Sequence, residues 1–243
     1  MAKTIKDPAE IFAEFTADYQ AIYGDDLISI ILYGSAARSD YRPGKSDINF
    51  MIVLSEQGID QLDRAFPVIR KWRKKNVAVP LFLTEIYVET STDVFPVEYL
   101  NFQQNHFLVF GRDVVKDLVF RPEFIRLQCE REIKGKLLLL RQAFLDAAGK
   151  AERLKRVVRH SVPGLAAIFE ALVRLQGSDV PMQPREIVKR TCELFDLDAG
   201  VFNRLFDIRE GKISPGHAEF RELFKAYIMQ MRKLAKRVDA WGE

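Results

Sequence analysis

The sequence has little cysteine and no long hydrophobic run. Its two cysteines, Cys129 and Cys192, do not form a Cys-x-x-Cys pair, which argues against a zinc site and against a disulfide framework. The longest apolar stretch, residues 77–83, is far shorter than the roughly 18 residues that a membrane-spanning helix needs. Residues 1–7 include charges and no apolar segment, so we expect no signal peptide. These features predict a reduced, cytoplasmic protein without a membrane partner.

Charge is divided unevenly along the chain, although the 243 residues have an ordinary globular composition. Residues 1–115 contain 12 Lys and Arg against 16 Asp and Glu, a net charge of −4. Residues 116–243 contain 25 against 18, a net charge of +7. This asymmetry suggests two units with different partners. The basic unit could attract an anion such as a nucleotide, a phosphorylated substrate or RNA, or it could simply have a solvated cationic surface.

Hydrophobic periodicity predicts an α/β unit at residues 1–115, followed by a helical unit at residues 116–243. In the first unit we expect helices at 8–23 and 59–75 and strands at 27–33, 47–54, 77–83 and 107–110. Pro80 places the third of these strands at a sheet edge or a bulge. In the second unit the expected helices are 122–148, 150–160, 164–176, 184–196, 198–210 and 215–240.

Gly34-Ser35 and Asp47-Ile48-Asn49 form the most informative pattern in the sequence. Gly34 follows an apolar strand and permits a sharp turn with close backbone approach. Helical residues from about 36 would place a helix N-terminus there, which favours an anion. Asp47 and Asn49 are two apart on a strand, so both side chains point to one face. A phosphate-holding turn beside oxygen ligands fits metal-assisted phosphoryl or nucleotidyl transfer.

This pattern resembles the nucleotidyltransferase superfamily, whose core in DNA polymerase β and kanamycin nucleotidyltransferase has Gly-Ser after one strand and Asp-x-Asp on the next. Eleven residues separate Ser35 from Asp47, Ser46-Asp47-Ile48 matches a family element, and Arg38 falls where many members have Arg. The resemblance implies an α+β fold: a mixed β-sheet core flanked by helices, followed by an all-α helical bundle. It also implies transfer of a nucleoside monophosphate from an NTP to a hydroxyl acceptor.

The same resemblance assigns roles to individual residues. Gly34, Ser35 and Arg38 would bind the nucleotide, while Asp47 and a second carboxylate would bind Mg²⁺. The sequence departs from the family here, because the second position is Asn49, whose amide oxygen can ligate Mg²⁺ but has no charge. A third, catalytic carboxylate is expected on a later strand, and Glu85 is the nearest candidate, with a plain surface glutamate as the alternative.

Three functions are therefore compatible with the sequence. The first is an active nucleotidyltransferase. The second is a catalytically degenerate module that binds a nucleotide or another protein, and Asn49 favours it over the first. The third is an RNA-binding or toxin–antitoxin component; it depends on charge alone, so nucleic acid is not the favoured partner. Titration with NTPs, with and without Mg²⁺, distinguishes these functions.

Overall fold

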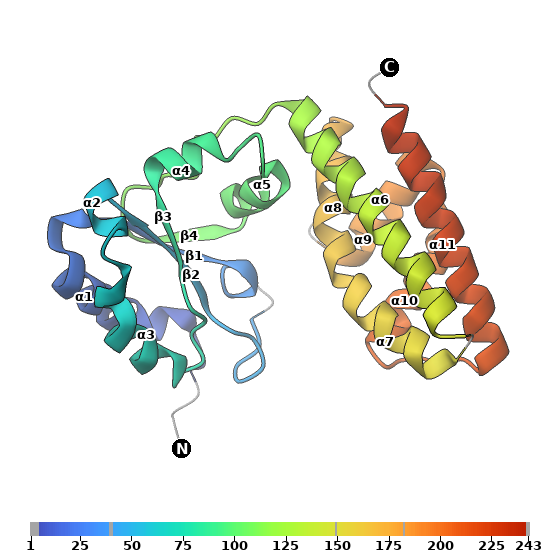
Figure 1. Cartoon of the computed structure of the whole chain (residues 1–243), viewed down its shortest axis with the longest axis horizontal. Coiled ribbons are helices and arrows are strands. Elements are labelled where there is room, and N and C mark those ends of the chain that lie inside the picture. Colours follow the sequence, from blue (N-terminus) through green and yellow to red (C-terminus); the bar gives the residue numbers. More distant parts are fainter. Residues whose placement is uncertain (1–4, 39–40, 149, 182, 242–243) are drawn as a thin grey trace. The chain divides into compact units, whose positions relative to one another are not determined.

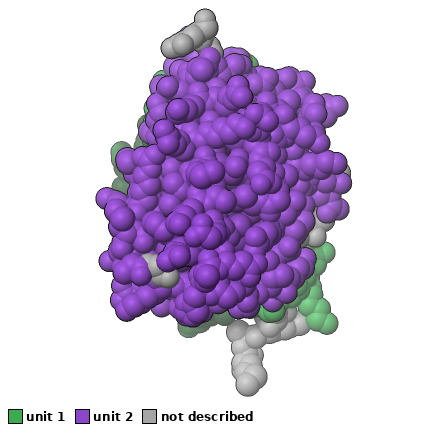
Figure 2. All heavy atoms as spheres, turned by 90° about the vertical axis from the view of Figure 1, so that its right-hand side faces the viewer, with its two compact units in different colours: residues 1–119 green, residues 120–243 purple. Residues whose placement is uncertain are grey.

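The computed structural model describes residues 5–38, 41–148, 150–181 and 183–241 (Figure 1). The chain divides into two compact units, residues 1–119 and residues 120–243 (Figure 2). The sequence places this division after residue 115. Within the described ranges, no helix is both long enough and apolar enough to cross a membrane.

Unit 1 is built on a four-stranded mixed sheet with the strand order β3-β2-β1-β4. The central strand β1 pairs antiparallel with both β2 and β4, and β3 pairs parallel with β2. The strand expected at 77–83 lies at the sheet edge, one of the two positions that Pro80 predicts, but it begins only at Leu81. The strands are β1 (Leu27–Tyr33), β2 (Asn49–Leu54), β3 (Leu81–Thr84) and β4 (His106–Gly111).

Helices α1 and α3 cover one face of this sheet (Figure 1). Phe15 of α1 stacks on Phe50 of β2 with the ring centroids 4.1 Å apart, and Trp72 of α3 meets Phe15 edge-on at 5.2 Å. The Trp72 indole nitrogen donates to Asp18 Oδ2 at 2.8 Å, so its polar atom has a partner despite burial. The helical elements of unit 1 are η1 (Pro8–Ile11), α1 (Phe12–Tyr23), η2 (Gly24–Asp26), η3 (Gly34–Ala36), α2 (Glu56–Ile59), η4 (Leu62–Ala65), α3 (Phe66–Arg73), α4 (Glu85–Thr90) and α5 (Pro96–Gln104).

The opposite face of the sheet includes the residues of interest. Tyr33 pairs with Asn49 on β2 and with His106 on β4, and residues paired directly across antiparallel strands share a face. Phe102 of α5 packs edge-on against Tyr33, with the ring centroids 5.0 Å apart. Helix α5, which the hydrophobic periodicity does not predict, therefore lies over the face that includes Asn49.

Unit 2 is entirely helical, as the periodicity predicts. Its longest helices, α6 and α11, run side by side (Figure 1), and Phe144 stacks on Phe224 between them at 5.8 Å. Lys134 of α6 forms an ion pair with Asp239 of α11 at 2.8 Å. The helices are α6 (Pro122–Asp146), α7 (Ala151–Ser161), α8 (Pro163–Leu175), α9 (Pro184–Phe195), α10 (Ala199–Arg209) and α11 (His217–Asp239). The mixed sheet and the helical unit confirm the predicted α+β fold class.

Candidate functional site

The turn after β1 is tight and depends on Gly34. Gly34 has φ +77°, a conformation that costs about 1–2 kcal/mol for residues with a Cβ. Its carbonyl oxygen accepts from the backbone nitrogens of Ala37 at 3.1 Å and Arg38 at 3.2 Å. The expected helix N-terminus is wrong: the described residues form only the short 3₁₀ turn η3. Any anion held here would meet turn amides, the Ser35 hydroxyl and Arg38 rather than the dipole of a long helix.

Asn49, the first residue of β2, faces this turn. It pairs with Tyr33, the residue before Gly34. A Cβ built on Gly34 would lie 3.2 Å from Asn49 Nδ2, so the amide of Asn49 fills the space beside the glycine. The structure thus brings Gly34 and Asn49 together.

Asp47 lies at the entrance to the same strand. Ile48 is fully buried in the core of unit 1 and forms a parallel bridge with Val77, whereas Asp47 is exposed and Asn49 is half-buried. Side chains alternate along an extended segment, so Asp47 and Asn49 project away from the core that contains Ile48. This arrangement leaves the Asp47 carboxylate accessible to a ligand.

The structure does not bring Glu85 to these residues, and the prediction that it supplies the third carboxylate is wrong. Thr84 pairs with Leu54 at the far end of β2, so the adjacent Glu85 lies six residues along the strand from Asn49, or about 20 Å. Both oxygens of Glu85 accept hydrogen bonds from Arg112 instead. Parallel pairing of β3 with β2 is the physical reason, because the end of one strand lies beside the end of the other.

The segment that runs beside Asn49, directly before β3, has no acidic residue. The parallel pairs Ile48–Val77 and Met51–Leu81 bracket it, and Ala78 N donates to Ile48 O at 3.0 Å. Residues 78–80 between these pairs are Ala, Val and Pro. Among the described residues, no group of three His, Cys, Asp or Glu side chains is placed to hold a metal ion.

The side-chain oxygens of Asp47 and Asn49 do not fit a pair of metal ions. Mg²⁺ binds oxygen ligands and shares them with substrate phosphates, and two-metal transfer needs carboxylates that bridge both ions. Here one carboxylate, Asp47, stands beside one neutral amide, Asn49. This donor set could supply two ligands to a single Mg²⁺ that a bound nucleotide also coordinates. We derive no reaction step through a metal pair.

Helix α5 contributes Asn101, which no sequence motif indicates. Arg38 is half-buried, and its Nη2 donates to Asn101 Oδ1 of α5. No motif in the sequence connects positions that are 63 residues apart. Pro96 at the first turn of α5 was the available sign of a helix in this region.

A second cluster of polar side chains lies on β4 at His106, the residue that pairs with Tyr33 on the side opposite β2. His106 Nε2 is 2.9 Å from Asp113 Oδ2, and His106 Nδ1 is 3.0 Å from the carbonyl oxygen of Gln103. Asp113 Oδ1 accepts from the backbone nitrogens of Val115 and Lys116. Burial raises the pKa of Asp113, but the hydrogen bonds from His106 and the two amides outweigh it and hold that pKa below its ordinary value. This cluster fastens the segment after β4 to the sheet.

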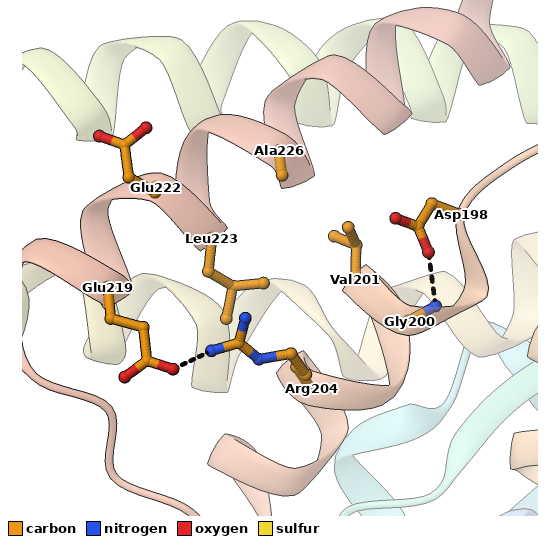
Figure 3. A pocket seen from close by; sticks show the side chains of 8 residues that line it. All are labelled: Asp198, Gly200, Val201, Arg204, Glu219, Glu222, Leu223 and Ala226. Carbon is orange, nitrogen blue, oxygen red and sulfur yellow. Dashed lines mark hydrogen bonds and ion pairs between the residues drawn. The ribbon is translucent and has the colours of Figure 1, made fainter.

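The described part of unit 2 has a hollow of about 420 Å³ beside α10 and α11 (Figure 3). Its charged groups have local partners: Arg204 pairs with Glu219, Glu222 with Lys225, and Asp198 caps α10 through Gly200 N. None of the predicted site residues lines it. The lining residues are Asp198, Gly200, Val201, Arg204, Glu219, Glu222, Leu223 and Ala226.

Comparison with known proteins bears on the fold. No protein-family model and no curated protein sequence matches the chain. Among solved structures, the chain is similar to spectinomycin adenyltransferase AAD(9) from Enterococcus faecialis, which was crystallised with ATP and spectinomycin. The match has a TM-score of 0.51 and 12% sequence identity, and it covers 93% of this chain and 99% of that one. The chain therefore has a nucleotidyltransferase fold, as the Gly34-Ser35 and Asp47-x-Asn49 spacing indicates.

Proposed function

We propose that this chain binds a nucleoside triphosphate at the Gly34–Arg38 turn and does not catalyse two-metal nucleotidyl transfer. The observation that supports this most strongly is the surroundings of Asn49. The position that faces Gly34 has a neutral amide, and the neighbouring residues 78–80 are Ala, Val and Pro. The turn has the geometry and donors that phosphate binding needs, while positions 49 and 78–80 supply no carboxylate.

Phosphate binding needs positive charge and hydrogen-bond donors in a small space. Ser35 supplies a hydroxyl, and the sharp turn at Gly34 allows phosphate oxygens to approach the backbone. Arg38 supplies a cation four residues after the glycine. The structural likeness to an adenyltransferase whose crystals contain ATP supports a nucleotide as the anion.

An active enzyme is the second candidate function, and Asp47 is the observation that favours it. Its exposed carboxylate occupies the first metal-ligand position of the motif. In that case the chain would transfer a nucleoside monophosphate to a hydroxyl acceptor, with one Mg²⁺ held by Asp47, Asn49 and the nucleotide phosphates. The adenyltransferase structure, which contains both ATP and spectinomycin, is consistent with an acceptor of this kind.

Calorimetric titration with ATP and GTP, each in Mg²⁺ and in EDTA, tests the proposal. We expect saturable binding in both buffers, with an affinity that Mg²⁺ raises by less than about tenfold, because only one carboxylate is available. No binding in either buffer would contradict the proposal. Binding that requires Mg²⁺, together with pyrophosphate release when hydroxyl acceptors are added, would favour the active enzyme.

RNA binding by the positively charged unit 2 is measured separately. We expect no sub-micromolar affinity for generic RNA at physiological salt, because charge alone does not create a nucleic-acid site. Tight RNA binding with a steep dependence on salt concentration would favour the RNA-binding alternative instead.

A further inference from the structure

The proposed nucleotide site includes a cation whose position depends on another element of unit 1. Arg38 N donates to Gly34 O at 3.2 Å, which ties the backbone of Arg38 to the turn. Its side chain reaches α5, where Nη2 donates to Asn101 Oδ1. The long arginine side chain has many rotamers in solution, so this contact restricts where the guanidinium lies.

The acceptor is itself held in one orientation. Asn101 Oδ1 also accepts from Asn105 Nδ2 at 3.0 Å, so two donors occupy both lone pairs of the amide oxygen. Asn105 is fixed in turn, because its backbone nitrogen donates to Asn101 O at 3.0 Å where α5 ends. The amide of Asn101 cannot flip without losing both bonds.

Helix α5 is also fixed relative to the turn. Phe102, the residue after Asn101, packs edge-on against Tyr33, and Tyr99 packs edge-on against Phe102 with the centroids 5.6 Å apart. Tyr33 directly precedes Gly34. One aromatic contact and one hydrogen bond thus connect α5 to the two ends of the segment 33–38.

We infer that Asn101 is a positioning residue, which holds the Arg38 guanidinium where it can contact the phosphate chain of the bound nucleotide. This inference rests on the proposed nucleotide-binding function and specifies its ligand class. A cation fixed beside the turn favours nucleotides with more phosphates, so the site selects triphosphates over monophosphates through Arg38.

The test compares the affinities of wild type and Asn101→Leu for ATP, ADP and AMP by calorimetry. A hydrogen bond between charged groups accounts for about tenfold to a hundredfold in affinity. We expect Asn101→Leu to lower the affinity for ATP about tenfold and the affinity for AMP less than about threefold. The ratio of the two affinities therefore falls. Asn101→Ser, which is smaller and more polar, is the second variant in case the leucine variant does not fold.

A double-mutant cycle separates positioning from general damage. If Asn101 acts through Arg38, Asn101→Leu should have no further effect on ATP affinity in an Arg38→Ala background. Gln103→Leu is the matched control: it removes an amide from the same helix, where Gln103 Nε2 donates to the carbonyl oxygens of Val115, Lys116 and Leu118. We expect it to lower stability and leave the ATP-to-AMP preference unchanged.

The outcomes distinguish the two proposals. If wild type binds ATP and both Asn101 variants keep its ATP-to-AMP preference, or if the Arg38 and Asn101 effects add, the inference on Asn101 is overturned while nucleotide binding stands. If wild type binds no nucleotide, the proposed function fails, and the inference fails with it.

Discussion

The amide of Asn49 occupies the space beside Gly34: a Cβ at Gly34 would lie 3.2 Å from Asn49 Nδ2. The contact joins the turn after β1 to the start of β2, because Tyr33 and Asn49 are directly paired. A side chain at position 34 would therefore disturb position 49 as well as strain the backbone. The turn after β1 and the start of β2 are therefore structurally coupled.

The first prediction concerns that turn. Gly34→Val with Ser35→Ala should abolish ATP binding, because Val cannot easily adopt φ +77° and would push Asn49 aside. Gly211→Val is the matched control, since Gly211 has φ +75° and open space around it in unit 2. Both changes should cost roughly 1–2 kcal/mol of stability. If the folded double variant bound ATP like wild type, the turn would not be part of the site.

The second prediction concerns Glu85. Glu85→Gln should leave ATP affinity within about twofold of wild type, because Glu85 lies about 20 Å along the strand from Asn49. The ion pair with Arg112, which is 68% exposed, should contribute at most about 1 kcal/mol. Asp47→Asn is the comparison variant and should weaken ATP binding in Mg²⁺ more than in EDTA. A large loss of ATP affinity in Glu85→Gln would show that Glu85 takes part in nucleotide binding and would contradict this prediction.

The third prediction concerns the acid stability of unit 1. Because the pKa of Asp113 is lower in the folded chain than the ordinary value of about 3.9, its ionised form stabilises the fold above that value. This stabilisation disappears as the pH falls from about 4 through the folded pKa. Asp113→Asn should cost about 1–2 kcal/mol at pH 7 and should flatten the pH dependence below 4. Parallel stability curves for the two proteins between pH 2 and 5 would contradict this role of Asp113.

Much of the fold could be predicted because its elements have clear local signals. The apolar run 27–33 is β1, and the helix expected at 8–23 is present as η1 and α1, with the Asp7 side chain accepting from Ala9 N at its start. The expected helix at 59–75 is in fact α2, η4 and α3. Pro67 lies in the first turn of α3, so this helix starts at Phe66 instead of running through.

The candidate site was only partly predictable, because its remaining members depend on pairing between distant segments. Gly34 and Asp47 belong to a short motif, whereas the position of Glu85 follows from the parallel register of β3 with β2. Sequence alone does not specify that register. Asn101 contacts Arg38 only because α5 packs over Tyr33. Helix α5 is short, and its apolar residues show little helical periodicity in the sequence.

If the proposed function holds, residue 49 lies where a nucleotide-bound metal would be and lacks the negative charge that the second carboxylate of the motif would supply. Asn49→Asp tests it directly, since Asp and Asn are nearly isosteric. Without metal, the new carboxylate near Asp47 adds like-charge repulsion. With Mg²⁺ and nucleotide, tighter metal binding to the folded protein stabilises it. Asn203→Asp, at a half-buried position in unit 2, makes the same change of charge at a residue that is not part of the candidate site.

Thermal melting of wild type, Asn49→Asp and Asn203→Asp, in EDTA and in millimolar Mg²⁺ with ATP, is the decisive measurement. We expect Asn49→Asp to lower the melting temperature in EDTA by about 2–5 °C and to raise it above that of wild type with Mg²⁺ and ATP. Asn203→Asp should respond to Mg²⁺ and ATP as wild type does. Equal responses of all three proteins would mean that residue 49 does not face a metal–nucleotide site, and would contradict the account.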